Sequence, residues 1–569
     1  MFLPMTPEEV KARGWDALDV ILVSGDAYID SPLHGVAVIG RVLEAQGFRV
    51  GIIACPDPAK DEDFCVLGEP RLFWGVTAGA VDSMVANYTP TGKPRRSDDL
   101  LPGGKNTRPD RATIVYTNVI RRIFKKTVPI VLGGIEASLR RIIHYDYWDD
   151  KLRRSILMDS KADYLVYGMG ERTVGELARA LQEGRDVSSL RGLCYLTSSP
   201  PDNAEVLPGW SEVNADPLVF IEMFHRFYVN QDPVLGRRLV QRQTSYDQVA
   251  RYLVHNPPAL PLREDELDEV YELPYEYDAH PIHQKQGPIR ALETIRFSLT
   301  THRGCYGECR FCAIAVHQGR QILSRSMESI VREAKRFLRH PAFKGYILDV
   351  GGPTANMWRM DCAKKSRTGS CRHRECLLPE PCDRLIPSHG DQLRLLETLR
   401  QLPGVKGVFV ASGIRPDLVY ADPDGERYVR EIARHFTSGQ LKLAPEHTER
   451  HILALMGKPS LTTLLRFRED FMKYSKQAGK KQFLTYYFIA AYPGCELSDM
   501  IKAREFANRF LYITPEQVQI FTPTPLTYAS VMYYTGRDPF HPERKIFVEK
   551  NPHDKQLQKN VLTEREKRF

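Results

Sequence analysis

Short apolar runs alternate with amphipathic stretches along most of this 569-residue chain, and the alternation restricts the chain to α/β folds. Within the first 200 residues, the runs predicted as strands are 20–23, 50–54, 72–76, 128–132 and 164–167. A helix is predicted over 36–45, with Gly47 as its stop signal. The pattern predicts a doubly wound parallel sheet for residues 1–200. Ligands of such sheets bind at the carboxyl ends of strands, here near 24–26 and 133–134.

A second alternating segment, residues 294–540, is predicted to form a partial (β/α)6 barrel. Its predicted strands are 294–299, 345–350, 405–411, 441–444, 483–490 and 517–521. The clearest helix is predicted over 326–339, where Met327, Ile330, Ala334 and Phe337 fall on one apolar stripe. The active site of such a barrel lies at the carboxyl ends of its strands.

Three segments lack this alternation. Residues 201–293 mix helical pieces with Pro-rich stretches, and we expect them to be a linker that wraps between the domains. Residues 358–385 form a Cys-rich insert in the barrel segment. Residues 541–569 are charged and weakly periodic, so we expect a tail without fixed structure.

The composition is that of a folded protein, with 42% hydrophobic and 26% charged residues. There is no apolar run long enough to span a membrane and no signal peptide, so we expect a cytoplasmic protein with no membrane partner. The net charge of +8 is modest, and local basic clusters occur at 93–96 and at 140–154. Solvated faces explain these clusters better than an RNA-binding surface does, although RNA stays open as a partner.

A loop with three cysteines, Cys305, Cys309 and Cys312, directly follows the first predicted barrel strand. Three thiolates with C-x3-C-x2-C spacing can hold three corners of a cubane [4Fe-4S] cluster. No fourth cysteine lies nearby, so one iron would keep an open position for a small chelator. The alternative is a zinc site completed by His302 or His317, but zinc sites usually pair two C-x2-C units or one such unit with a distant His pair.

A second cysteine group, Cys362, Cys371, Cys376 and Cys382, lies in the insert. Its four thiolates would fully satisfy a metal, so an auxiliary iron–sulfur cluster and a structural zinc ion are both open. Free thiols or redox disulfides are the remaining alternative. The other four cysteines are scattered and are interpreted as buried thiols.

Several stretches of the chain, including the three-cysteine loop, resemble the radical S-adenosylmethionine (SAM) superfamily, and in particular the YgiQ-type radical SAM proteins. The resemblance runs from about residue 15 to 540 and rests on these stretches: Arg303-Gly304-Cys305, Phe311-Cys312-Ala313-Ile314, His317-Gln318-Gly319-Arg320, 349–357 (DVGGPTANM) and 442–448 (KLAPEHT). It implies that SAM chelates the open iron and that its reductive cleavage gives a 5′-deoxyadenosyl radical.

The resemblance also implies which residues meet SAM. Gly351 and Gly352 match the glycine pair whose backbone meets the SAM amino group. Ser412 and Arg415 follow the third barrel strand, where contacts to the SAM carboxylate or ribose are usual, and Glu446 follows the fourth. Residues 490–492 match the strand end beside adenine. Where the superfamily often has an acidic residue after the glycines, this chain has Pro353.

The N-terminal pattern is similar to the cobalamin-binding domains that precede the barrel in many radical SAM enzymes. A D-x-H-x-x-G cobalt-ligand motif is absent, because the segment from Asp30 to Gly35 places His34 at the wrong spacing. Since a similar fold does not transfer a ligand, we expect no bound cobalamin.

We therefore interpret the chain as a radical SAM enzyme that abstracts hydrogen from an unknown substrate and takes its electron from an external donor. The alternatives are an iron–sulfur binding or sensor protein without turnover, an RNA-modifying radical SAM enzyme, and a zinc-stabilised nucleic-acid-binding protein.

Overall fold

The computed structural model describes residues 1–244 and 249–564. The chain divides into two compact units. The N-terminal unit comprises Met1–Leu262 and Glu269–Arg296, and the C-terminal unit comprises Arg263–Asp268 and Phe297–Phe569. None of the helices in the described part of the chain combines the length and the apolar character needed to cross a membrane.

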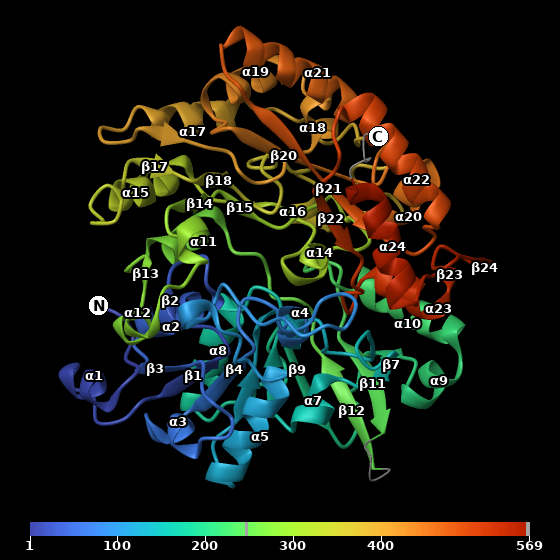
Figure 1. The fold of residues 1–569 in the computed structure, drawn as a ribbon. Helices are drawn as coiled ribbons and strands as arrows, with labels where there is room; N and C mark the ends of the chain where they lie inside the picture. The colour runs from blue at the N-terminus through green and yellow to red at the C-terminus, as the bar shows by residue number, and fades with distance from the viewer. Residues whose placement is uncertain (245–248, 565–569) are drawn as a thin grey trace. The chain divides into compact units, whose positions relative to one another are not determined.

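The N-terminal unit is built on a large sheet whose first five strands are parallel (Figure 1). They are β1 (Val20–Ser24), β3 (Val50–Ala54), β4 (Phe73–Thr77), β5 (Ile130–Leu132) and β8 (Tyr164–Val166). Each lies within two residues of a predicted strand, so this part of the α/β prediction is confirmed. Their spatial order, β3-β1-β4-β5-β8, is a doubly wound order that reverses between β1 and β4.

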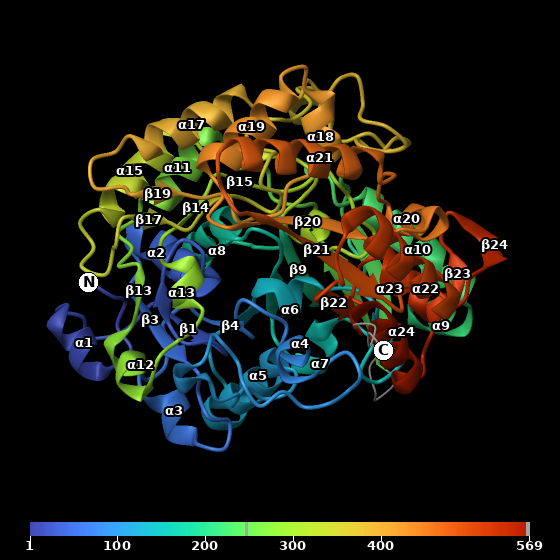
Figure 2. The ribbon, with the colours of Figure 1, turned by 45° about the horizontal axis from the view of Figure 1, so that its top comes forward.

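Helices cover both faces of this sheet. α2 (Gly35–Ala45), predicted over 36–45, packs on α8 (Glu171–Gln182), and α5 (Ala112–Phe124) packs on α3 (Asp61–Cys65) and α7 (Ile156–Ser160). Figures 1 and 2 show the two helix groups on opposite faces. Buried apolar strands between two helical layers explain the continuous apolar runs in the sequence. The shorter elements of this unit are α1 (Pro7–Ala12), β2 (Ile29–Asp30), α4 (Ser83–Asn87), α6 (Gly134–Ser138), β6 (His144–Asp146), β7 (Lys151–Arg153), β13 (Asp278–Ala279), α12 (Pro281–Gln286) and α13 (Leu292–Ile295).

Residues 201–293, expected to be a linker, instead extend the same sheet. After β8 come β9 (Leu193–Thr197), β12 (Ala250–His255), β11 (Leu239–Thr244) and β10 (Glu205–Leu207). Helices α9 (Trp210–Ala215) and α10 (Pro217–Val229) lie between β10 and β11 in the chain, and α11 (Glu264–Glu272) follows β12. The strand signal was hidden because β11 buries two polar side chains, Gln241 and Gln243, which hydrogen-bond to each other at 2.9 Å.

The C-terminal unit contains parallel strands that pair in chain order. β14 (Ser298–Thr300) pairs with β18 (Asp349–Gly351), and β17 (Tyr346–Ile347) pairs with β19 (Gly407–Val408). β20 (Gln440–Glu446), β21 (Phe483–Ala490) and β22 (Gln517–Ile520) form a three-stranded sheet, and a parallel bridge joins Ile414 to Leu443. The first strand starts later than predicted, because 292–295 form helix α13.

Helices connect these strands, as Figure 2 shows for α15, α17, α19 and α21. They are α15 (Met327–Phe337), α17 (Gly390–Arg400), α18 (Pro416–Ala421), α19 (Gly425–His435), α20 (Arg450–Met456), α21 (Thr462–Gln477) and α22 (Leu497–Phe506). The helix predicted over 326–339 is confirmed as α15; Ser326 caps its N-terminus by accepting a hydrogen bond from the Ser329 N–H. The insert at 358–385 contains one short helix, α16 (Lys365–Thr368).

The segment expected to be a charged tail is folded where the structure describes it. β24 (His541–Lys545) pairs with β23 (Arg537–Asp538), and α24 (Pro552–Thr563) packs on α22, β21 and β22. Asn551 caps α24, and the helix buries Lys555, Gln558 and Leu562. The apolar periodicity of α24 is weak because two of its three buried side chains are polar. Residues 565–569 of the expected tail lie outside the described residues.

Candidate functional site

The three-cysteine loop lies within the connection between two short paired strands and ends at a short helix. β15 (His302–Arg303) pairs with β16 (Leu323–Ser324), and α14 (Ile314–His317) begins just after Cys312. Gly304 opens the loop with φ +83°, and a Cβ there would lie 1.9 Å from the Gln321 carbonyl oxygen. Only glycine fits this turn, so the Gly304-Cys305 pair in the sequence has a steric cause.

The loop is held from both sides by backbone hydrogen bonds. The Arg310 N–H donates to the Met456 carbonyl at the end of α20 (2.9 Å), and the Ala529 N–H donates to the Arg310 carbonyl (2.8 Å). Ala529 belongs to α23 (Tyr528–Thr535). Since two separate elements fix the loop between Cys309 and Cys312, its cysteines sit on a rigid support.

The environment of the thiols is largely buried. Burial raises the pKa of Cys305, and it raises the pKa of Cys312 to about 12. A positively charged metal centre is what would make such thiols give up their protons.

Within the ranges 1–244 and 249–564, no three His, Cys, Asp or Glu side chains converge as the ligands of one metal ion. In a cubane each thiolate binds a different iron, so its ligands stand farther apart than those of one zinc ion. The cluster and the zinc interpretation of this loop therefore both stay predictions.

The glycine pair at the end of β18 lies against the base of the loop. A Cβ on Gly351 would touch the Ser412 side chain at 3.2 Å, and a Cβ on Gly352 would lie 2.6 Å from the His302 ring. Two residues further on, Thr354 Oγ1 is 3.6 Å from Cys305 Sγ. The predicted SAM-binding backbone and the first cluster cysteine are thus in one place.

Ser412 is held by an acidic residue to which the sequence analysis assigned no role. The Ser412 hydroxyl donates to Asp349 Oδ2, and the N–H groups of Ala411 and Ser412 donate to Oδ1 at 2.7 and 3.1 Å. Asp349 therefore fixes the chain after β19. It falls inside the 349–357 motif, which was the only signal that could have found it.

Arg415 points at the cysteine loop. Its guanidinium makes a forked ion pair with Asp417 (Nη2–Oδ2 2.7 Å, Nε–Oδ1 3.1 Å), and Nη1 lies 3.8 Å from Cys309 Sγ. The Asp417 carboxylate raises the pKa of Arg415 further, so the group is a permanent cation. The predicted contact with the SAM carboxylate would have to use the donors that Asp417 leaves free.

Glu446 ends β20 with φ +66° and lies beside Lys458, whose Nζ is 4.0 Å from its carboxylate. Burial raises the pKa of Glu446. Its charge is close enough to Cys312 to contribute to the raised pKa of that thiol. Glu446 and the cysteine loop therefore share one buried region, as the interpretation of a SAM or substrate contact requires.

The second cysteine group packs partly on the same apolar cluster as Cys305. Cys362, Cys376 and Cys382 contact a buried cluster formed by Tyr306, Ile322, Met357, Leu377, Leu385 and Leu418. Cys371 is exposed and accepts a hydrogen bond from Lys364 Nζ at 3.5 Å. Burial raises the pKa of Cys376 to about 11. In the described chain these four do not converge on one ion either, so the auxiliary metal stays a prediction.

In the N-terminal unit, the strand-order reversal between β1 and β4 is occupied by a buried charge cluster. Arg108 forms ion pairs with Asp26 (2.6 Å) and Asp98 (2.7 Å), and His34 Nε2 lies 3.2 Å from Asp26 Oδ2. His34 is only 2% exposed. Its ring belongs to this cluster, so a cobalamin bound here would have to be held without His34 as its ligand.

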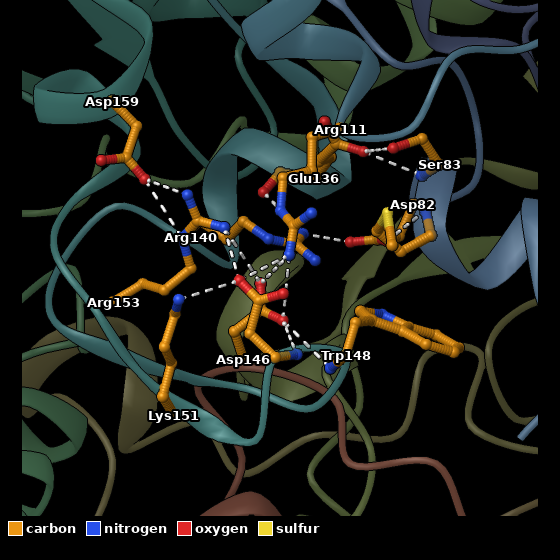
Figure 3. A network of polar contacts seen from close by, with 12 residues as sticks. Asp82, Ser83, Arg111, Glu136, Arg140, Asp146, Trp148, Lys151, Arg153 and Asp159 are labelled. Carbon is orange, nitrogen blue, oxygen red and sulfur yellow. Dashed lines mark hydrogen bonds and ion pairs between the residues drawn. The ribbon is translucent and has the colours of Figure 1, made fainter. Parts of the chain in front are cut away.

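The basic cluster at 140–154 is internal in part, and Figure 3 shows the polar contacts of Arg140, Lys151 and Arg153. Arg140 pairs with Asp82, Arg111 with Asp146 (3.3 Å), and Arg153 with Asp159 (2.8 Å). The expectation of a solvated face is therefore wrong for Arg140 and Arg141, which are 5% and 0% exposed. The 93–96 cluster, in contrast, is exposed.

Comparison with known proteins gives the class of the chain. The family model described as "Radical SAM N-terminal" matches residues 2–298, and a model of a domain of unknown function (DUF3362) matches 516–568. With the cysteine loop placed against the β18 glycines, this match makes the chain a radical SAM protein.

Within that class, the chain belongs to the UPF0313 family. A UPF0313 protein of Fusobacterium nucleatum is 51% identical over 569 residues, covering 100% of this chain and 99% of the relative. A UPF0313 protein of Methanocella arvoryzae is 48% identical over 564 residues, covering 98% and 92%. The recognition made from the motifs is confirmed.

Two solved structures share the fold. TsrM from Kitasatospora setae, a radical S-adenosylmethionine methyltransferase with cobalamin and a [4Fe-4S] cluster bound, has a TM-score of 0.51 at 16% identity and covers 90% of this chain and 74% of its own. OxsB, a cobalamin-dependent S-adenosylmethionine radical enzyme with aqua-cobalamin bound, has a TM-score of 0.50 at 11% identity and covers 92% and 56%. Because both neighbours hold cobalamin, the expectation that this chain binds none is not supported.

Proposed function

We propose that this chain is a radical SAM enzyme in which Cys305, Cys309 and Cys312 bind a [4Fe-4S] cluster at the mouth of a partial (β/α)6 barrel. The cluster, when bound, would supply one electron that cleaves SAM into methionine and a 5′-deoxyadenosyl radical. That radical would take a hydrogen atom from the substrate. An external donor would supply the electron. The substrate would bind in the same site, next to SAM.

The observation that carries this proposal is the contact between the cysteine loop and the end of β18. Cys305 Sγ lies 3.6 Å from Thr354, two residues after the Gly351-Gly352 pair. SAM chelating the open iron would have its amino group near that glycine backbone, which has no side chain to obstruct it. Both features were named from the sequence, and they are far apart in it.

The other residues of the site would orient SAM and exclude water. Ser412 is fixed by Asp349, and Glu446, whose side chain is 13% exposed, lies beside Lys458. A hydroxyl group can donate a hydrogen bond to a ribose or accept one from it, and a carboxylate can accept one from a ribose hydroxyl. The neighbour TsrM is named a methyltransferase, but 16% identity supports a shared fold and carries no reaction to this chain.

The test is anaerobic reconstitution with iron and sulfide, followed by reduction and addition of SAM. We expect about four irons and four sulfides per chain and the formation of 5′-deoxyadenosine. Cys309→Ala should lose the cluster and the product, while the N-terminal unit stays folded. The matched control is Cys65→Ala, which removes an exposed thiol of the N-terminal unit and should change neither.

The outcomes separate the alternatives. A cluster that binds SAM without any 5′-deoxyadenosine would favour an iron–sulfur sensor. Zinc without iron and sulfide at the first loop would favour the zinc-stabilised nucleic-acid-binding protein. An RNA substrate would show as binding that weakens steeply with salt.

A further inference from the structure

Arg415 is a buried cation beside the cysteine loop, and its neighbours show what its guanidinium contacts. The guanidinium Nη1 lies 3.8 Å from Cys309 Sγ. A Cβ on Gly307 would lie 2.6 Å from the same Nη1, so the loop has a glycine where the guanidinium passes. The side chain therefore packs into the loop that carries the cluster cysteines.

The orientation of the guanidinium is set by Asp417. Oδ2 of Asp417 accepts from Nη2 at 2.7 Å, and Oδ1 accepts from Nε at 3.1 Å. This forked pair occupies the Nε–Nη2 edge of the guanidinium, and Nη1, on its other side, lies next to the sulfur of Cys309.

The backbone of Arg415 is clamped by a second buried residue, Asn356. Asn356 Oδ1 accepts from the Arg415 N–H (2.8 Å), and Asn356 Nδ2 donates to the Arg415 carbonyl (3.1 Å). The other Nδ2 hydrogen points at His389 Nε2 (3.1 Å), and His389 Nδ1 is 2.7 Å from Asp422. Asn356, His389 and Asp422 thus hold the backbone of Arg415 through a series of hydrogen bonds.

We propose that Arg415 tunes the reduction potential of the cluster, with Asp417 and Asn356 as its positioning residues. This inference rests on the proposed function. A cluster gains one electron and no proton when it is reduced, so it becomes one unit more negative. A cation that donates an N–H to a cysteine sulfur stabilises that reduced form and raises the potential. Asp417 partly cancels the cation and limits the rise.

Substitutions of Arg415 and Asp417 are therefore predicted to shift the midpoint potential of the cluster in opposite directions. Arg415→Gln removes the charge and the charged N–H donor, so the midpoint potential should fall. Asp417→Asn keeps the donor and removes the compensating negative charge, so the potential should rise. Opposite shifts from two neighbouring substitutions are not a general consequence of a loosened site.

The experiment is a redox titration of the reconstituted protein without SAM, followed by electron paramagnetic resonance of the reduced cluster. Arg400→Gln is the matched control, because it removes the same charge from an exposed side chain on α17, where solvent screens it. Its potential should equal that of the wild type. Iron and sulfide content is measured for every variant.

A fall with Arg415→Gln and a rise with Asp417→Asn would support the assignment. An unchanged potential in Arg415→Gln, together with weaker SAM binding, would overturn the assignment and indicate that Arg415 recognises SAM instead. If Arg415→Gln holds no cluster, the shift of the midpoint potential in Asp417→Asn is the deciding result. A potential that does not rise in that variant would overturn the proposal. Absence of a cluster in the wild type would instead refute the proposed function.

Discussion

The side-chain amide oxygen of Gln558 lies 3.0 Å from the backbone nitrogen of Ala491 and accepts its hydrogen bond. Gln558 Nε2 also donates to the Cys495 carbonyl at 3.4 Å. Helix α24 therefore holds the loop that follows β21, which the resemblance places beside the adenine of SAM. The loop needs this support because Ala491 has φ +56°, a conformation that is strained for alanine.

Gln558→Leu should weaken SAM binding, because it leaves the buried Ala491 N–H without a partner. The unfolding free energy of the C-terminal unit should fall by about 1–3 kcal/mol. Isothermal titration of the reconstituted protein with SAM measures the first effect, and urea unfolding measures the second. Gln556→Leu, an exposed site on the same helix, is the control and should change neither. Equal effects at both positions would contradict this role of Gln558.

Gly352→Ala should disturb the cluster site, because the new methyl group would meet the His302 ring at 2.6 to 2.8 Å. His302 is fully buried and cannot move without repacking, so we expect a loss of roughly 1–3 kcal/mol together with weaker SAM binding. Gly439→Ala, where no atom lies within 4 Å of the added Cβ, is the control. Wild-type SAM affinity in Gly352→Ala would argue against the assigned contact.

Arg141→Lys should destabilise the N-terminal unit. The Arg141 guanidinium is buried between Tyr167 (4.5 Å) and Phe227 (4.8 Å) and donates to His255 at 3.0 Å. An ammonium group cannot reproduce this planar stacking or its several directed donors, so the cost should be about 1–3 kcal/mol. Hydrogen exchange of peptides from this unit measures it. Arg179→Lys, on the exposed side of α8, should show no change.

Acid should destabilise the N-terminal unit through His144. Burial lowers the pKa of His144 from 6.5 to about 4, so the unfolded chain binds a proton that the folded chain does not. Stability therefore falls as the pH drops from about 6.5 to about 4, by up to about 3 kcal/mol from this residue.

His144→Asn tests this directly, because asparagine can still donate to the Ile142 carbonyl but does not titrate. Hydrogen exchange of peptides from 139–160, measured at pH 7 and at pH 4.5, compares the two proteins. The variant should lose less stability than the wild type over this range. An identical loss would assign the acid sensitivity to other groups.

The elements with strong apolar periodicity could be predicted from the sequence. β1 and β3 could be predicted because each buries a run of apolar side chains, β21 because its apolar side chains are buried at alternate positions, and α15 because its stripe repeats at helical spacing. Elements with polar interiors were missed. β11 buries Gln241 and Gln243, and α24 buries Lys555 and Gln558, so neither has an apolar signature.

The residues of the candidate site also fall into two groups, those with a local sequence signal and those without one. Cys305, Cys309 and Cys312 are close in sequence, and Gly351-Gly352 lie within a recognisable motif, so local patterns were sufficient. Asp349 lies inside that motif without any sign of its role. His389 and Asp422 gave no signal, because they come from separate elements and reach Arg415 through Asn356.

The class of protein can be inferred from local features of consecutive residues: the C-x3-C-x2-C loop, the glycine pair and the alternation of strands and helices. The contact of Arg415 with Cys309 and the support of Ala491 by Gln558 come instead from the way the unit packs. Such contacts join elements separated by more than sixty residues. They form because buried polar groups need hydrogen-bond partners. The partners can come from distant parts of the chain, since the packing of the whole unit brings them together.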